Sequence, residues 1–163
     1  MRLLRSEAED FLYNEAHLLD QRRYDDWVKL FTPDGIYWLP MEDGSDPELV
    51  PSVLYDDMHL LRMRVHQYSK RHYSQRPPSR TVRAISNVTV VDGDADNDVL
   101  VRCVVVVTEL REGDYLQRGL GEQRVFSGHC EYRLLVGEGI SIAMRKILLL
   151  NRESPIVNLS FIL

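Results

Sequence analysis

Apolar residues recur at helical spacing near the start of the chain. They fall three or four positions apart and so form one stripe along a helix, which must be buried against another element. Ser6 followed by Glu9 matches the capping-box pattern, which predicts that this helix begins near Glu7. The stripe consists of Ala8, Phe11, Leu12, Ala16 and Leu19.

A corner at residues 21–24 is predicted to end this helix, and a short second helix follows. Asp25 or Asp26 can cap the second helix. Residues 32–35, with the sequence TPDG, favour a type I turn, because proline presets φ and glycine tolerates the exit conformation. The apolar side chains that the short helix turns toward the core are Trp27, Leu30 and Phe31.

A first strand and a third helix are predicted next. The strand covers residues 36–40 and ends at its proline, and after a polar loop residues 52–55 form a second, shorter strand. Asp56 can then cap a helix that reaches about Lys70. The inner face of this helix would consist of Met58, Leu61, Val65 and Tyr68.

The period of the apolar residues changes to two from Thr81 onward, which predicts long strands. Their connections are short, and short connections require antiparallel neighbours. Helices followed by an antiparallel sheet predict an α+β fold with the helices packed on one face of the sheet. The predicted strands are residues 81–91, 98–110, 123–135 and 140–150.

Residues 99–107 and 147–150 are apolar on both faces of their strands. A sheet that its own helices cover on one side has only one buried face. The nearly uncharged segment 154–163 would also be a poor solvent-exposed tail. We therefore expect an oligomer in which residues 99–107 and the tail carry subunit contacts, so that removing residues 155–163 weakens assembly and leaves the fold intact.

Composition predicts a soluble protein with a single domain over residues 1–163. Hydrophobic residues make up 44% of the chain and charged residues 28%, as in ordinary globular proteins. Without an apolar run of the ~20 residues that a membrane span needs, and without a signal-peptide pattern, we expect a cytoplasmic protein with no membrane partner. The net charge of −5 argues against nucleic acid as a partner. Cys103 and Cys130 are predicted to be reduced packing residues.

Residues 92–98 alternate acidic side chains in the manner of a calcium loop. Asn97 stands where such a loop needs glycine, and Cys103 stands where it needs a bidentate glutamate. A hairpin turn is therefore predicted instead.

Asp56, His59 and His66 are the residue types that bind mononuclear non-haem iron. On one helix the two histidines would lie about 10 Å apart along the axis, which is too far to share a metal ion. Both are predicted to be ordinary residues of a helix surface.

An acid–base pocket inside the curved sheet is the remaining catalytic possibility. For Tyr13, Tyr37 and His17 the other interpretation is that each packs against the fold and makes a hydrogen bond at its rim. The Rieske cluster signature, glycine-rich phosphate loops and a Gly-x-Ser-x-Gly elbow are absent from the sequence, so no catalytic, cofactor-binding or metal-ligating residue is assigned. The candidates for the pocket are Tyr13, His17, Tyr24, Asp34 and Tyr37.

Four stretches of the chain follow one another in an order typical of one known family. They are FLYNEAHLLDQRRYDDWVKLFTPDGIYWLP, SVLYDDMHLLRMRVHQYSK, PPSRTVRAISNVTV and MRKILLLN with a short apolar tail. Together, from about Glu7 to Leu163, they resemble the small (β) subunit of bacterial Rieske-type aromatic-ring-hydroxylating dioxygenases. The resemblance implies a cystatin-like, NTF2-like cone, in which a strongly curved and mostly antiparallel sheet wraps around the first helix.

The same resemblance implies a structural and assembly role in the terminal oxygenase of aromatic compound catabolism, which is an oxidoreductase. Its large α subunit would hold the Rieske cluster and the mononuclear iron and carry out cis-dihydroxylation, with electrons from NAD(P)H through a reductase. The implied assembly is an α3β3 hexamer built on a trimer of this chain, which would have no cofactor and no activity of its own.

Two other classes stay open, namely a free-standing NTF2-like dehydratase or isomerase with a pocket inside the cone, and a pure binding module. A large polar cavity lined by Tyr13, His17 or Asp34 would favour the enzyme. We expect apolar side chains to fill that space instead. The residues expected to fill it are Phe11, Leu12, Leu19, Trp27 and Trp38.

Overall fold

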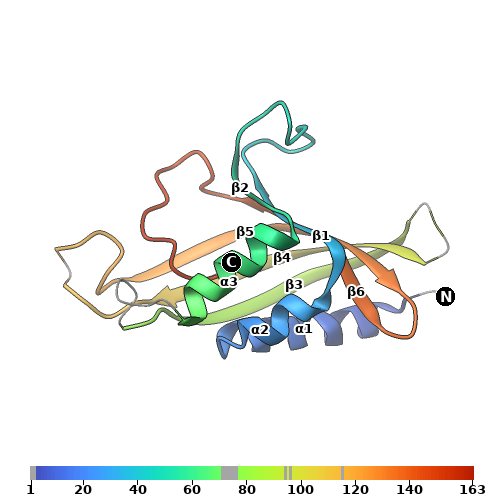
Figure 1. Ribbon diagram of the computed structural model, residues 1–163, viewed down its shortest axis with the longest axis horizontal. Helices are drawn as coiled ribbons and strands as arrows, with labels where there is room; N and C mark the ends of the chain where they lie inside the picture. The colour runs from blue at the N-terminus through green and yellow to red at the C-terminus, as the bar shows by residue number, and fades with distance from the viewer. Residues whose placement is uncertain (1–2, 71–76, 94, 96, 115) are drawn as a thin grey trace.

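Six strands form one curled sheet, and the helices lie against it (Figure 1). The computed structural model describes residues 3–70, 77–93, 95, 97–114 and 116–163. The helices are α1 (Arg5–Asp20), α2 (Tyr24–Trp27), the 3₁₀ turn η1 (Val28–Leu30) and α3 (Met58–Lys70). The strands are β1 (Phe31–Pro40), β2 (Ser52–Asp56), β3 (Arg80–Asp92), β4 (Asp98–Leu110), β5 (Gln123–Val136) and β6 (Ile140–Leu149).

The sheet has the strand order β2-β1-β6-β5-β4-β3 and is antiparallel except where β1 runs parallel to β6. The four long strands begin and end within one residue of their predicted bounds. This confirms the predicted α+β fold with a mostly antiparallel sheet. In the described part of the chain, no helix is both long and apolar enough to cross a membrane.

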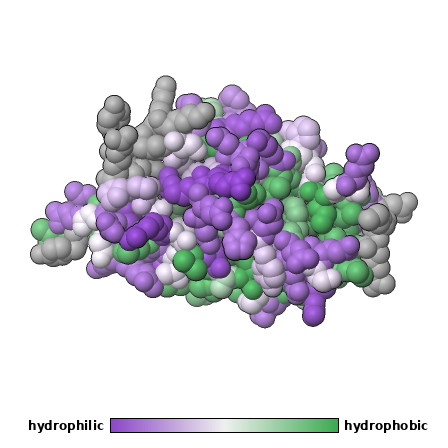
Figure 2. Space-filling view, turned by 90° about the horizontal axis from the view of Figure 1, so that it is seen from below, coloured by the Kyte–Doolittle hydropathy of each residue, from purple (hydrophilic) through white to green (hydrophobic). Residues whose placement is uncertain are grey.

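Helix α1 packs its apolar stripe into the concave side of the sheet. Ala8, Leu12 and Leu19 are fully buried, whereas Phe11 and Ala16 are only partly buried. The predicted inner face of α3 is confirmed, because Met58, Leu61, Val65 and Tyr68 are all buried in the same core. The side of the molecule on which α1 lies carries mostly hydrophilic residues, with hydrophobic residues in separate patches (Figure 2).

The predicted helix caps lie at neighbouring positions instead. Helix α1 begins at Arg5 because the Leu4 N–H donates to the Glu7 carboxylate at 2.8 Å, so Ser6 is not its cap. Asp57 caps α3 by accepting a bond from the Leu60 N–H at 2.9 Å. Asp56, the predicted cap, ends β2 instead and is buried.

The cap of the short second helix was also predicted wrongly, since Arg23 rather than Asp25 or Asp26 stands at the N-cap of α2. The Asp26 carboxylate instead binds the Arg23 and Lys29 side chains. Trp27 is fully buried, as predicted. Phe31 is also buried, and its ring packs edge-on against that of Trp27 with 5.0 Å between the centroids.

The predicted turn over residues 32–35 is wrong, because these residues belong to β1. The pairing of β1 with β6 shifts register between Phe31 and Ile36, so the four residues between them bulge from the ladder. A Cβ added to Gly35 would lie 3.1 Å from the main-chain oxygen of Ile142, and glycine allows this close approach.

Trp38 does not fill the cone as we expected. Its ring packs edge-on against Tyr55, and the Lys146 ammonium lies 5.6 Å from the ring centroid. Lys146 pairs with Glu131 in register on the side of the sheet opposite the core. Trp38 therefore covers the convex face.

The end of the chain returns to the core and lies beside α3 (Figure 1). Phe161, Ile162 and Leu163 are each 1% exposed and belong to the hydrophobic core. The expectation that these residues are left for subunit contacts is therefore wrong. That the fold survives removal of residues 155–163 stays a prediction. The apolar composition of the tail reflects burial within its own chain.

Replacing Leu12 by Ala tests how far the packing of α1 stabilises the cone. Leu12 is fully buried, so we expect Leu12→Ala to lower the free energy of unfolding by about 2–5 kcal/mol. Tyr13→Ala, at the next position on the exposed side of α1, should change it by less than about 1 kcal/mol. Urea unfolding measures both, and equal losses would contradict the packing described.

Candidate functional site

The centre of the cone holds an ion pair between α1 and β6. The Arg145 Nε lies 3.0 Å from Glu15 Oε1, and the two side chains are 1% and 2% exposed. Tyr132 Oη on β5 donates to Glu15 Oε2 at 2.7 Å and accepts from Arg145 Nε at 3.0 Å. The indole N–H of Trp27 donates to Glu15 Oε1 at 2.9 Å. Both oxygens of the buried carboxylate are therefore bound.

Aromatic rings surround the Arg145 guanidinium. Its central carbon lies 5.9 Å from the Trp27 ring centroid, 5.5 Å from that of Tyr37 and 5.6 Å from that of Tyr132. Burial acts to lower the pKa of Arg145, but the charge of Glu15 and the neighbouring tyrosines outweigh it, and the pKa is raised. The guanidinium therefore stays charged, and its Nη1 also donates to the main-chain oxygen of Leu163.

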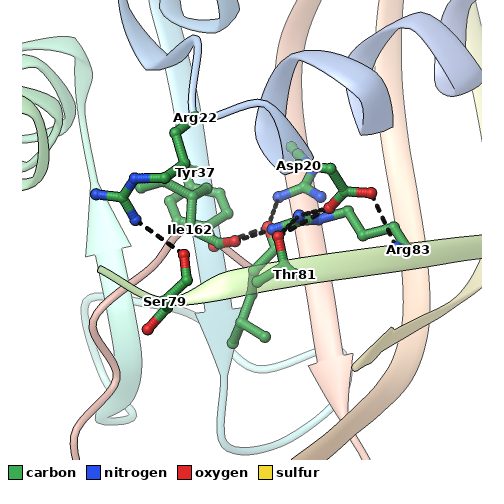
Figure 3. A network of polar contacts seen from close by, with 9 residues as sticks. Asp20, Arg22, Tyr37, Ser79, Thr81, Arg83 and Ile162 are labelled. Carbon is green, nitrogen blue, oxygen red and sulfur yellow. Dashed lines mark hydrogen bonds and ion pairs between the residues drawn. The ribbon is translucent and has the colours of Figure 1, made fainter. Parts of the chain in front are cut away.

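A second polar network joins the end of α1 to β3 (Figure 3). The Asp20 carboxylate accepts from Thr81 Oγ1 at 2.8 Å, from the Arg83 N–H at 3.0 Å and from the Arg83 guanidinium. Arg83 Nη2 donates to the main-chain oxygen of Ile162. Because the Arg83 side chain is 1% exposed, burial lowers its pKa, although Asp20 opposes the shift.

A third network lies near the start of β3 and the end of β4. Glu109 is fully buried, and its two oxygens accept from Ser79 Oγ at 2.7 Å and from Arg124 Nε at 2.9 Å. Ser79 Oγ also lies 2.8 Å from Ser160 Oγ. In all three networks the acidic groups are held by guanidinium or hydroxyl donors, an arrangement that fixes positions and does not present a free acid or base.

The five residues proposed for an acid–base pocket do not come together. Tyr13, His17 and Asp34 are exposed on the surface. Tyr24 and Tyr37 are buried, and burial raises the pKa of both, to about 12 for Tyr37. The expectation that Leu12, Leu19 and Trp27 fill the interior is confirmed by their complete burial.

The three residues considered as iron ligands, Asp56, His59 and His66, do not form a common site either. Asp56 binds Arg64 through Oδ2 and Nε at 2.6 Å. Both histidines are exposed on α3, as predicted, and they line a surface groove on the outer side of that helix. Among the residues that the structure describes, no three His, Cys, Asp or Glu side chains are placed to hold a metal ion together.

The calcium-like stretch connects β3 to β4, which pair as an antiparallel hairpin as predicted. The Gly93 N–H donates to the main-chain oxygen of Asp98 at 2.8 Å and closes the turn. Asp94 and Asp96 lie outside the described residues.

The two cysteines stand directly opposite each other on β4 and β5. Both are buried and reduced, as predicted. A contact with the Cys103 thiol and burial raise the pKa of Cys130. The Cys130 thiol is therefore a neutral packing group.

The sequence patterns did not single out four buried charged residues, namely Glu15, Arg83, Glu109 and Arg145. Glu15 did give a signal, because it falls three residues after Leu12 and four before Leu19, on the apolar stripe of α1. Arg145 gave a similar signal as a charged residue among the apolar residues of β6. A charge at a core position predicts a buried partner, but the pattern does not name that partner.

Replacing Glu15 by Gln leaves the Arg145 charge buried without its counter-ion. We therefore expect Glu15→Gln to lower the free energy of unfolding by about 3–5 kcal/mol. Glu9→Gln on the same helix is the control, since Glu9 pairs with a largely exposed Arg5 and should cost less than about 1 kcal/mol. Chemical denaturation compares them, and a Glu15→Gln variant as stable as Glu9→Gln would show that the pair is not needed.

The raised pKa of Tyr37 predicts a loss of stability at high pH. Above the ordinary pKa of 10.0 the unfolded chain releases this proton, whereas the folded chain keeps it until about pH 12. The free energy of unfolding should therefore fall across that window by about 1.4 kcal/mol per pH unit from this residue. Tyr37→Phe should show a shallower decline in urea unfolding from pH 9 to 12 than the unmodified chain, and parallel curves would contradict the assignment.

Comparison with known proteins places this sequence beside the β subunits of ring-hydroxylating dioxygenases. Residues 14–154 match the model of the ring hydroxylating beta subunit family. The small oxygenase component of the p-cumate 2,3-dioxygenase system from Pseudomonas putida is 33% identical over 134 residues, which span 80% of this chain and 69% of that protein. Benzene 1,2-dioxygenase subunit beta from Pseudomonas putida is 30% identical over 171 residues, spanning 97% of this chain and 88% of that protein.

The same fold is found in the β subunit of benzoate 1,2-dioxygenase from Burkholderia mallei. The TM-score is 0.76 with 22% sequence identity, and the superposition covers 99% of each chain. The resemblance seen in the four sequence stretches and the predicted NTF2-like cone are thereby confirmed. Because the family model matches most of the chain and the curled sheet matches as well, this chain belongs to the ring hydroxylating beta subunit family.

Proposed function

We propose that this chain is the structural and assembly subunit of the terminal oxygenase of an aromatic-ring-hydroxylating dioxygenase. The cis-dihydroxylation takes place on a large α subunit, which carries the Rieske cluster and the mononuclear iron and receives electrons from NAD(P)H through a reductase. The observation that carries this proposal is the filled cone. Leu12, Trp27 and Arg145 occupy its interior at no more than 1% exposure, where a catalytic pocket would need open space.

Among the residues that the structure describes, we infer that none is catalytic, cofactor-binding or metal-ligating, and the chemistry of the buried side chains supports this. The buried carboxylates of Glu15 and Glu109 are held by guanidinium groups. Cys103 and Cys130 face each other inside the core. We infer that the chain is one NTF2-like domain over residues 1–163 and that it works in the cytoplasm.

The convex face of the sheet supports a role in assembly. Val82 on β3 and Val125 on β5 flank Thr108 on β4 in register, and the two valines are 70% and 59% exposed. Leu150, 79% exposed, bonds to Ser127 in the next row of the same face. Exposed apolar residues that form contiguous rows mark contact surfaces. This face suits contacts in a trimer of this chain and with the α subunit, in an α3β3 hexamer.

Val125→Glu tests the role of the convex face. A charge in an apolar contact surface is costly, so we expect Val125→Glu to weaken assembly about tenfold or more. Asn14→Glu introduces the same side chain on the exposed side of α1 and should assemble normally. Light scattering of each variant co-expressed with the large subunit gives the mass of the complex, and normal assembly of Val125→Glu would contradict the role of this face.

Co-expression with the gene neighbour also tests the function itself. We expect a red-brown complex in which this chain copurifies with a subunit that carries a Rieske motif. Neighbours without that motif, together with turnover by the isolated chain, would favour a free-standing dehydratase or isomerase.

A further inference from the structure

The last residues of the chain occupy the cone in the manner of a bound ligand. We propose that the interior of the cone is a binding site for a short apolar peptide and that this chain fills the site with its own residues 157–163, here called the C-terminal segment. The segment forms neither helix nor strand. This inference does not depend on the proposed assembly role.

Side chains of the cone bind the main-chain oxygens of the C-terminal segment. Tyr68 Oη donates to the oxygen of Leu159 at 3.0 Å, and Tyr37 Oη donates to that of Leu163 at 3.3 Å. Arg83 and Arg145 donate to the oxygens of Ile162 and Leu163. At the mouth, Arg124 donates to the oxygens of Val157 at 2.6 Å and Asn158 at 3.1 Å. These side-chain donors give the main-chain oxygens of the extended segment the hydrogen-bond partners that buried backbone needs.

The side chains of the segment supply an anchor. Phe161 packs edge-on against Phe126, with 5.5 Å between the ring centroids. Phe161, Ile162 and Leu163 are each 1% exposed, and Ser160 Oγ lies 2.8 Å from Ser79 Oγ. At protein interfaces, a few residues fully buried in well-packed pockets carry most of the binding energy, and Phe161 is buried in this way.

The Arg83 guanidinium gives independent evidence for a site built around a ligand. Its side chain is 1% exposed, and its Nε is buried without a hydrogen-bond partner although Nη1 and Nη2 are bound. A buried donor without a partner is costly, because its lost hydration is not replaced. The donors on this side of the cone therefore exceed the acceptors that the chain's own segment supplies beside Ile162.

The connection to the segment allows the site to be emptied. Glu153, Ser154 and Pro155 are exposed and lie after the last strand. Cutting the chain there leaves the strands and helices of the cone in one piece and makes the segment a separate peptide held by noncovalent contacts, which also include a bond from Asn158 Nδ2 to the main-chain oxygen of Arg118.

The experiment inserts a site-specific protease sequence between Ser154 and Pro155 and cuts the folded protein. The cleaved peptide should remain bound to the cone and elute with it in size-exclusion chromatography. An added, fluorescein-labelled peptide of residues 155–163 should then replace it over time. Phe161→Ala in the added peptide should weaken binding about tenfold or more. Pro155→Ala in the same peptide, at an exposed position, should bind as the unchanged peptide does.

Three results would overturn the proposal. The first is a folded, cut cone that loses its peptide and does not bind the labelled one. The second is equal binding of the Phe161→Ala and unchanged peptides, measured by fluorescence anisotropy. The third is a cone that unfolds when cut, by circular dichroism, and is not refolded by added peptide. Failure of assembly with the large subunit would affect none of these readouts.

Discussion

The Glu15–Arg145 ion pair is the constraint around which the cone is organised. Removing two charges from water is costly, and their attraction offsets that cost only when the geometry is good and the remaining donors and acceptors are bound. Here Tyr132 and Trp27 complete the shell of Glu15, and three aromatic rings surround Arg145. The pair therefore fixes α1, α2, β5 and β6 relative to one another. A shift of α1 or β6 would separate the two charges, and a shift of α2 or β5 would break a hydrogen bond to Glu15.

This constraint also decides what the interior can do. A curved sheet around a helix can enclose a pocket, and the fold alone does not say whether it does. In this chain Trp27 and the residues Phe161, Ile162 and Leu163 take that volume, and each buried acid is held by a donor. The outside of the molecule carries exposed apolar residues, among them Val82, Val125 and Leu150. The proposed assembly role rests on these two features, namely an interior filled by side chains and a convex sheet face with exposed apolar residues.

Local pattern predicted those parts of the fold that depend on period alone. The four long strands and the inner face of α3 follow from spacings of two and of three to four residues, although the register of β3 and of β5 with their neighbours each shifts once. The caps of α1 and α3 were predicted one or two residues away from their positions, because several acidic and hydroxyl side chains near each helix start can serve as caps. Trp38 was assigned to the wrong face, since β1 is apolar on both sides and period two cannot then distinguish them.

The candidate site could not be predicted, because its members meet only through tertiary structure. Glu15 and Arg145 come from opposite ends of the chain, and nothing in the spacing of either one points to the other. The tail was assigned to a subunit contact because apolar composition shows that a segment is covered without showing what covers it. Phe161 is covered by Phe126 of its own sheet.

Exchange of the Arg145 Nε proton with water, followed by nuclear magnetic resonance, tests the filled and organised interior most directly. This proton is bound to Tyr132 in a side chain 1% exposed, whereas the Arg102 Nε, bound to Glu131, belongs to a side chain 57% exposed. The account predicts that the Arg145 proton exchanges many times more slowly than that of Arg102. Equal exchange rates would mean that water reaches the centre of the cone and would contradict it.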